Sequence, residues 1–268
     1  DELDRAAELM RPLWESLGWN ALPIPSQWCQ DFGAQFETLL ELKPAAVSFT
    51  FGILDAAQVA RLHSAGMLVI GTVTTVDEAL AWERIGADAV VASGVESGGH
   101  RGTFIGRQED ATLPARALWP LVAGAVKIPV IAAGGIMTGS DINEALAAGA
   151  AAVQMGTAFL VCDESGIHAA YKQRLIDAGD TPTRLTRAFS GRYARGLENR
   201  FMKQLEPVEN QLPAYPVQNA LTTPIRAAAA KRGDTELMSL WAGAEVRRAR
   251  PMPAAKLVQT LVAEMGIE

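Results

Sequence analysis

The stretch that decides the fold is residues 87–102, Ala-Asp-Ala-Val-Val-Ala-Ser-Gly-Val-Glu-Ser-Gly-Gly-His-Arg-Gly. Its apolar run, Ala89–Ala92, lacks polar alternation, which is typical of a strand buried on both faces of a parallel sheet. Its last part, Ser97–Gly102, places a histidine among glycines just beyond the end of that strand. Because glycine lets a ligand approach the backbone closely, we interpret His100 as an acid/base or ligand-contacting group at a sheet edge.

Apolar runs of the same kind recur on both sides of this stretch, and helical segments alternate with them. Short apolar runs predict five strands, at Ala45–Phe51, Met67–Val73, Ala87–Ala92, Ile128–Ala133 and Ala151–Met155. Helices are predicted at about Ala56–Ala65, Thr75–Ile85, Ala115–Val126 and Ser140–Gly149, with Ser140 as a cap and Glu78 at capping-box spacing from Thr75. Repeated βα units with buried strands indicate an α/β fold with a parallel sheet under helices.

We predict a (β/α)8 TIM barrel, with an open doubly wound sheet as the structural alternative. Five parallel strands cannot close, and residues 1–43 have a helical pattern, with a second helix at roughly Phe32–Leu42. The expectation is therefore that three strands lie before Asp1 and are absent from this chain. The predicted organisation is a helical insertion at 1–43, the C-terminal part of the barrel at 44–163, and a loop and helical extension at 164–268 that packs on the barrel.

The C-terminal third lacks the βα alternation. Helices are predicted at Ile167–Ala178, Leu237–Val246 and Ala254–Met265. A polar, glycine-marked loop is predicted at Phe189–Gly196, and the proline-containing segment Gln204–Pro224 is expected to be irregular.

Two further strands also end in glycine. One is followed by Gly134-Gly135, and the next by Met155-Gly156-Thr157. Barrel enzymes often hold phosphate with the loops after their last two strands, so we predict a phosphorylated cofactor there. Arg101 follows His100 directly and is interpreted either as a surface arginine or as a group that attracts an anionic substrate.

Composition excludes several function classes. The net charge of −6 and the absence of a basic run argue against nucleic acid as a partner. No apolar run approaches the roughly 18 residues that a membrane span needs. Cys29 and Cys162 are isolated thiols without metal-ligand spacing, which fits a reducing cytoplasm and predicts no metal site.

Four motifs together resemble the nitronate monooxygenases, formerly called 2-nitropropane dioxygenases, of the bacterial class I type. They are Ser97–Gly102, Pro129–Ile136, Ala152–Phe159 and Ser190–Arg195 with Asn199. The similarity is clearest from about Pro44 to Arg200. Each motif alone is shared with other FMN barrels, whereas the four in this order and spacing are specific.

The resemblance implies FMN at the mouth of the barrel part, residues 44–163. The histidine that matches His100 lies near the flavin in such enzymes and acts as a base or a substrate contact. The family usually has a flavin-contacting glutamine seven residues earlier, where this chain has the shorter Ser93. Cofactor-binding candidates are Ser93, Gly98, Gly99, Gly134, Gly135, Gln154, Met155, Gly156 and Thr157, and the substrate-contact candidates are His100 and Arg101.

The implied function is FMN-dependent oxidation of alkyl nitronates, with nitroalkanes as a further substrate class, by O2 to carbonyl compounds and nitrite. This is the activity of a detoxifying monooxygenase with small-molecule partners, expected in the cytoplasm as a monomer or homodimer. One alternative is an FMN-dependent NAD(P)H reductase of the enoyl-thioester reductase type, which shares the Gly-Gly-His and Ala-Gly-Gly motifs. The other alternative is a flavin- or phosphate-binding protein without activity.

Overall fold

The computed structural model describes residues 2–266. Within them the chain forms two compact units, each assembled from separate stretches of sequence. The parallel-sheet unit comprises residues 31–97, 101–158 and 253–266. The histidine unit comprises residues 2–30, 98–100 and 159–252, and so includes His100.

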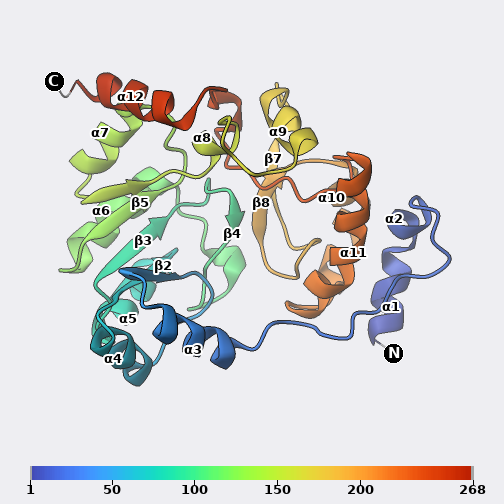
Figure 1. Cartoon of the computed structure of the whole chain (residues 1–268), viewed down its shortest axis with the longest axis horizontal. Coiled ribbons are helices and arrows are strands. Elements are labelled where there is room, and N and C mark those ends of the chain that lie inside the picture. Colours follow the sequence, from blue (N-terminus) through green and yellow to red (C-terminus); the bar gives the residue numbers. More distant parts are fainter. Residues whose placement is uncertain (1, 267–268) are drawn as a thin grey trace. The chain divides into compact units, whose positions relative to one another are not determined.

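The parallel-sheet unit is built on five strands in the order β1-β2-β3-β5-β6, all parallel to their neighbours (Figure 1). This confirms the five strands that the apolar runs predict. Among the described residues the sheet is open, with β1 and β6 at its edges. The further strands expected before Asp1 stay a prediction. The strands are β1 (Ala46–Phe49), β2 (Leu68–Val73), β3 (Ala89–Ser93), β5 (Val130–Ala133) and β6 (Ala152–Gln154).

Helices follow the strands as the sequence predicts. They are α3 (Phe32–Leu42), α4 (Ala56–Ser64), α5 (Val76–Arg84), α6 (Ala115–Ala125), α7 (Gly139–Ala147) and α12 (Ala254–Met265), while α8 (Thr157–Leu160) begins in this unit. The predicted bounds of α3 and α12 are confirmed at both ends. The buried core lies between strands and helices and includes Val69, Trp82, Val90, Ala92, Leu118 and Trp119.

One helix cap differs from the prediction, and a second cap is confirmed without its predicted capping box. Ser140 is already inside α7, and Thr138 is the N-cap because its backbone is extended and its side chain accepts a hydrogen bond from the N–H of Asp141. Thr75 caps α5 as expected, but Glu78 does not complete a capping box with it. The side chain of Glu78 is fully buried and makes its hydrogen bonds to other backbone N–H groups instead.

Glu78 instead holds the loop that follows Arg101. Its buried carboxylate accepts hydrogen bonds from the N–H groups of Thr74 at 2.6 Å, Phe104 at 2.5 Å and Ile105 at 3.0 Å. Such charge-assisted bonds are about twice as strong as neutral ones. The loop beyond the histidine motif is therefore fixed to the first turn of α5.

The histidine unit contains a three-stranded antiparallel sheet in the order β4-β8-β7. The strands are β4 (Gly99–His100), β7 (Thr183–Thr186) and β8 (Ala194–Leu197). The prediction of a loop throughout Phe189–Gly196 is therefore wrong for residues 194–196. Short polar strands of an antiparallel sheet lack the continuous apolar run that marks the buried parallel strands.

Helices and 3-10 turns complete this unit. They are α1 (Glu2–Leu9), α2 (Arg11–Glu15), α9 (Ala169–Ile176), α10 (Arg200–Leu205), α11 (Val217–Arg232), η2 (Glu206–Gln211) and η3 (Val246–Arg248). The irregular segment predicted at Gln204–Pro224 is wrong, because α11 runs through Pro224. The helix predicted at Leu237–Val246 is also wrong, because this segment consists of bends and turns, with an isolated bridge from Trp241 to Gly196 of β8.

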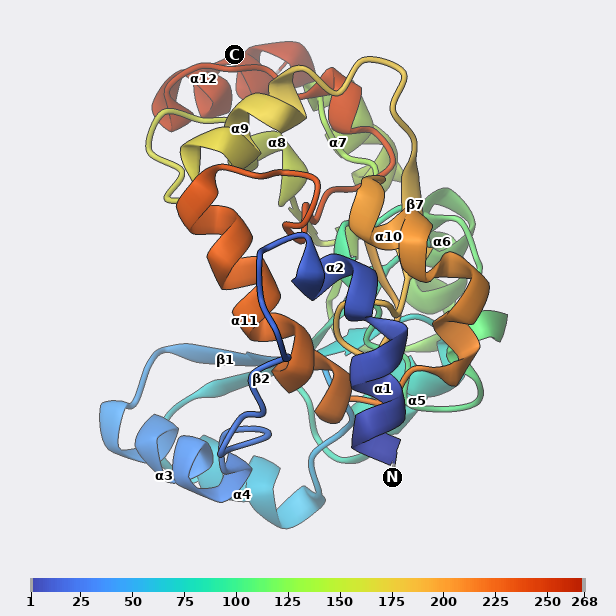
Figure 2. The same cartoon turned by 90° about the vertical axis from the view of Figure 1, so that its right-hand side faces the viewer.

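The core of the histidine unit joins its first and last helices. Figure 2 shows α1 and α2 beside α10 and α11. Apolar side chains from all four helices meet in one buried cluster that includes Met10, Leu13, Phe189, Phe201, Leu221 and Ile225.

In the described part of the chain, no helix has the length and apolarity required to span a bilayer.

Candidate active site

The predicted cofactor residues of the parallel-sheet unit lie in one row at the carboxyl ends of neighbouring strands. Ser93, the last residue of β3, pairs with Ala133 of β5, and Ala133 pairs with Gln154 of β6. Because the strands are parallel, the segments after them leave the same edge of the sheet. We call residues 93–97, 134–135 and 154–157 the rim.

Backbone donors of the rim are available to a ligand. Among the described residues, no hydrogen bond uses the N–H groups of Gly134, Gly135, Met155 or Gly156. A Cβ added at Gly156 would meet no atom within 4 Å. These residues are half-buried or exposed, and such a group of open N–H donors suits an anion such as phosphate.

Gly134 adopts its conformation because the turn after β3 packs against it. Its φ is 109°, and a Cβ there would lie 2.8 Å from Ser97 Oγ. Ser93 Oγ donates to Ser97 Oγ at 2.9 Å. The hydroxyl of Ser93 is thus committed to the rim itself, which agrees with its being too short to replace a glutamine at a flavin.

Arg101 is buried, with 1% of its surface exposed, so the surface-arginine interpretation is wrong. Its guanidinium donates to the carbonyl oxygens of Ser93 at 2.8 Å, Gly94 at 2.5 Å and Ala111 at 3.1 Å. These hydrogen bonds satisfy the carbonyl groups at and just after the end of β3 and connect the rim to the loop before α6. The geometry therefore indicates that Arg101 holds the rim in place and does not attract the substrate.

His100 lies in β4, where it pairs with Ala194 of β8. Its Nε2 is 2.8 Å from Ser190 Oγ, and its ring centroid is 5.3 Å from that of Trp241. Phe189 packs edge-on against the same tryptophan at 5.3 Å. We call His100, Ser190 and Trp241, with Arg192 and Arg226 described below, the histidine cluster.

The hydroxyl proton of Ser190 decides the tautomer of His100. Ser190 Oγ also lies 3.1 Å from the carbonyl oxygen of Arg192, which is long for a hydroxyl donor. A hydroxyl has a single proton to donate, and the 2.8 Å contact with Nε2 is the shorter of the two, so we infer that Ser190 donates to Nε2 and accepts from the N–H of Arg192 at 3.3 Å. The ring proton is then on Nδ1, which can donate a hydrogen bond to an anion.

Burial is the main cause that lowers the pKa of His100 from 6.5 to about 4, and the positive charges of Arg192 and Arg226 add to it. The imidazole is therefore neutral at physiological pH. The hydrogen bonds of Arg226 all go to neutral groups, Asn219 and Thr223. Two cations around a neutral histidine form a site that attracts an anion and disfavours imidazolium.

Gly98 and Gly99, predicted to contact flavin, serve different purposes. A Cβ at Gly98 would lie 2.5 Å from the backbone nitrogen of Gly243, so close packing of two chain segments requires this glycine. A Cβ at Gly99 would meet nothing within 4 Å. Gly98 is exposed and Gly99 is half-buried, so both keep backbone surface that a ligand can approach.

The sequence reasoning missed two members of the histidine cluster. No local sequence pattern distinguishes Trp241 from the other tryptophans. Arg226 follows Asn219 and Thr223 at helical spacing on the alanine-rich α11. A polar stripe on such a helix is the signal that could have indicated it.

Parallel strands whose carboxyl ends are lined by glycines are typical of α/β enzymes of the barrel type, which act on small molecules. The nitronate monooxygenase family model matches residues 3–264. A probable nitronate monooxygenase of Staphylococcus aureus strain Newman is 40% identical over 238 residues, covering 88% of this chain and 67% of that protein.

Solved structures agree. A nitroalkane oxidase from Streptomyces ansochromogenes superposes with a TM-score of 0.92 at 45% identity, over 99% of this chain and 76% of that one. FabK from Thermotoga maritima gives a TM-score of 0.72 at 32% identity, over 86% and 71% of the two chains. This chain belongs to the nitronate monooxygenase family, and it is an oxidoreductase of a flavoprotein family.

Proposed function

We propose that the protein binds FMN and oxidises alkyl nitronates with O2 to carbonyl compounds and nitrite. Two nitronate anions and one O2 balance two carbonyl products and two nitrite anions. The observation that carries this proposal is the histidine cluster, in which burial, together with the positive charges of Arg192 and Arg226, lowers the pKa of His100 to about 4. A site with this charge distribution suits a substrate that is already an anion.

The rim residues fit the phosphate of FMN. The open N–H groups of Gly134, Gly135, Met155 and Gly156 would hold the phosphate, and Arg101 would keep the rim in shape. When bound, the flavin supplies the electron exchange between the nitronate and O2. The protein supplies binding, orientation and the exclusion of water.

His100 is proposed to bind the nitronate rather than to generate it. Its Nδ1–H would donate to a nitro oxygen, while Arg192 and Arg226 supply the attracting charge. A base with a pKa of about 4 removes a proton from a neutral nitroalkane inefficiently, because catalytic bases work best near the operating pH. We therefore expect nitronates to be strongly preferred over nitroalkanes.

The test is O2 uptake by the flavin-loaded protein with short alkyl nitronates. We expect nitronate-dependent uptake with nitrite release in the balance given above, and heat-released flavin with the mass of FMN. No uptake with any short nitronate would reject the proposal.

The motifs shared with enoyl-thioester reductases leave one alternative function, that of an FMN-dependent NAD(P)H reductase. Rapid bleaching of the flavin by NADPH together with enoyl-thioester turnover would decide for that reductase.

Replacing Gly156 with leucine tests the rim. The added side chain meets no protein atom near the backbone, so the fold should tolerate it while the approach of phosphate is blocked. We expect FMN affinity to fall by about tenfold or more, measured by flavin fluorescence titration. Gly166→Leu is the matched control, since Gly166 is also exposed with open space around it. Equal affinity in both variants would place the phosphate elsewhere.

A further inference from the structure

The turn that carries Ser190 is held by side chains from elsewhere in the histidine unit. The turn at residues 186–191 starts at the last residue of β7 and leads toward β8. Its N–H group at Gly191 donates to the carbonyl oxygen of Arg187 at 2.7 Å. A tight turn of this kind leaves other backbone groups without a strand partner. Four of these groups, the N–H groups of Arg187 and Ala188 and the carbonyl oxygens of Ala188 and Phe189, have partners outside the turn.

The N–H groups at the start of the turn go to one carboxylate oxygen. Glu209 Oε1 accepts from the N–H of Arg187 at 2.9 Å and of Ala188 at 3.1 Å, and the Thr186 hydroxyl donates to the same oxygen. Hydrogen bonds to an ionised acceptor are worth more than neutral ones, so this oxygen is a strong anchor.

The carbonyl groups of the turn go to buried side chains of α11. Gln218 Nε2 donates to the carbonyl oxygen of Ala188 at 2.6 Å, and Thr222 Oγ1 donates to that of Phe189 at 2.5 Å. Both side chains are fully buried. The backbone that leads into Ser190 is thus held from η2 on its donor side and from α11 on its acceptor side.

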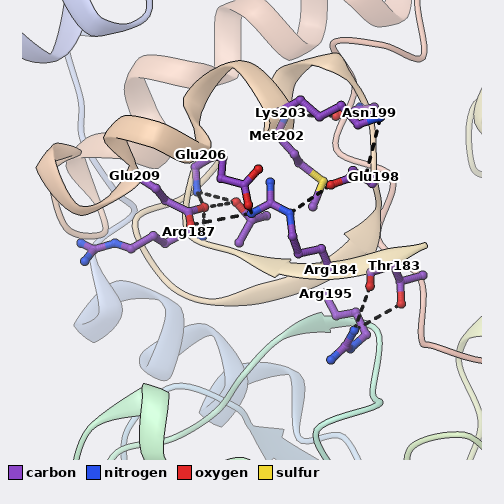
Figure 3. A network of polar contacts seen from close by, with 12 residues as sticks. Thr183, Arg184, Arg187, Arg195, Glu198, Asn199, Met202, Lys203, Glu206 and Glu209 are labelled. Atoms are coloured by element: carbon purple, nitrogen blue, oxygen red, sulfur yellow. Dashed lines mark hydrogen bonds and ion pairs between the residues drawn. The ribbon is translucent and has the colours of Figure 1, made fainter. Parts of the chain in front are cut away.

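Glu209 belongs to a network of charges around Arg184 (Figure 3). The guanidinium of Arg184 lies 3.3 Å from Glu198, 3.5 Å from Glu206 and 4.0 Å from Glu209. Within the described residues, only Glu209 of these three carboxylates also accepts from the turn. Its side chain is 15% exposed, whereas that of Glu206 is 56% exposed.

We propose that Glu209 is a positioning residue for His100: its carboxylate fixes the turn at residues 186–191, and the turn places the Ser190 hydroxyl against His100 Nε2. Glu209 touches neither His100 nor a substrate. It acts through the backbone of Arg187 and Ala188 and through the hydroxyl of Ser190. Only its effect on turnover rests on the proposed function; its effect on the imidazole does not.

The experiment uses nitrogen NMR of the histidine rings in the whole chain. The sequence has three histidines, so His63 and His168 are internal references. In the wild type we expect His100 to carry its proton on Nδ1 and to titrate near pH 4. In Glu209→Ala the turn loses its acceptor, Ser190 moves away and water reaches the ring. We expect the proton to shift to Nε2 and the pKa to rise by about one unit or more.

Two further variants separate positioning from general stability. Glu209→Gln keeps an acceptor oxygen without the charge, and we expect an intermediate shift of the His100 signals. Glu206→Ala removes another partner of Arg184 without touching the turn, and we expect wild-type signals. The kcat/KM for nitronates should fall about tenfold in Glu209→Ala, because a misplaced His100 loses its contact with the substrate.

The outcomes are distinct. Wild-type His100 signals in folded Glu209→Ala and Glu209→Gln would overturn the proposal, and so would an equal change in Glu206→Ala. If Glu209→Ala does not fold, Glu209→Gln decides alone by the same signals. Altered His100 signals in a protein that oxidises no nitronate would support the positioning role and reject the proposed function.

Discussion

Replacing His100 with alanine is expected to lower kcat/KM for alkyl nitronates by about a hundredfold, since removing one positioned donor to an oxyanion typically costs this much. Flavin content should stay near that of the wild type, because the open N–H groups assigned to the phosphate lie on the rim. The measurement is initial O2 uptake with nitronate at several concentrations, beside the visible spectrum of each preparation.

His168→Asn is the matched control. His168 lies in the same unit and caps α9 through Nδ1, which accepts from the N–H of Ala170 at 3.2 Å. Asparagine is an equally good N-cap, so we expect unchanged activity and stability. A loss in His100→Ala that is confined to neutral nitroalkanes would contradict anion binding and assign His100 as a base.

The pH dependence follows from the lowered pKa of His100. Above pH 5 the folded protein already has a neutral imidazole, so this group should impose no change in nitronate kcat/KM between pH 5 and pH 8. The unfolded chain binds the proton near pH 6.5 and the folded protein only near pH 4. Between these values the folded state binds fewer protons, so the free energy of unfolding should decrease as the pH falls. His100→Ala should remove this part of the acid sensitivity.

Replacing Arg101 with methionine is expected to lower the free energy of unfolding by about 3 kcal/mol or more. The change removes three hydrogen bonds that the guanidinium donates to buried carbonyl oxygens. These oxygens then stay buried without a hydrogen-bond donor, which is unfavourable. At about 2–4 °C per kcal/mol, Tm should fall by roughly 6–12 °C in a protein of this size. Thermal unfolding of the protein without flavin measures this effect independently of activity.

Arg107→Met is the control for Arg101. Arg107 lies in the same loop, is 75% exposed and pairs only loosely with Glu109 at 3.8 Å. We expect its Tm to stay within about 2 °C of the wild type, as for most surface changes. A stable Arg101→Met protein with a strongly raised KM for nitronates would contradict the supporting role and restore Arg101 as a substrate contact.

The sequence was sufficient for the parallel sheet because each of its strands carries its own signal. Runs such as Ala89–Ala92 are apolar without alternation, and the glycines after them mark the strand ends. The last helix was placed correctly because Pro253 precedes it and Gly266 ends it. These signals are local, so they can be read without knowing what packs against them.

The rest depends on partners that are distant in the sequence. The strand Thr183–Thr186 is polar and forms because β8 pairs with it. The role of Arg101 depends on carbonyl groups up to ten residues away, and a charged side chain is usually expected at the surface. Nothing near Glu209 in the sequence indicates that its carboxylate serves a turn more than 20 residues earlier.

The docking of α12 on α7 affects how the chain can be synthesised and folded. Glu264 accepts a hydrogen bond from the N–H of Gly139, which precedes it by 125 residues, and the whole of the last histidine-unit segment lies between them. Ribosomal synthesis proceeds from the N-terminus, so the nascent sheet leaves the exit tunnel well before this helix does. The face of α7 that α12 covers must then stay uncovered until the residues of α12 themselves have been synthesised.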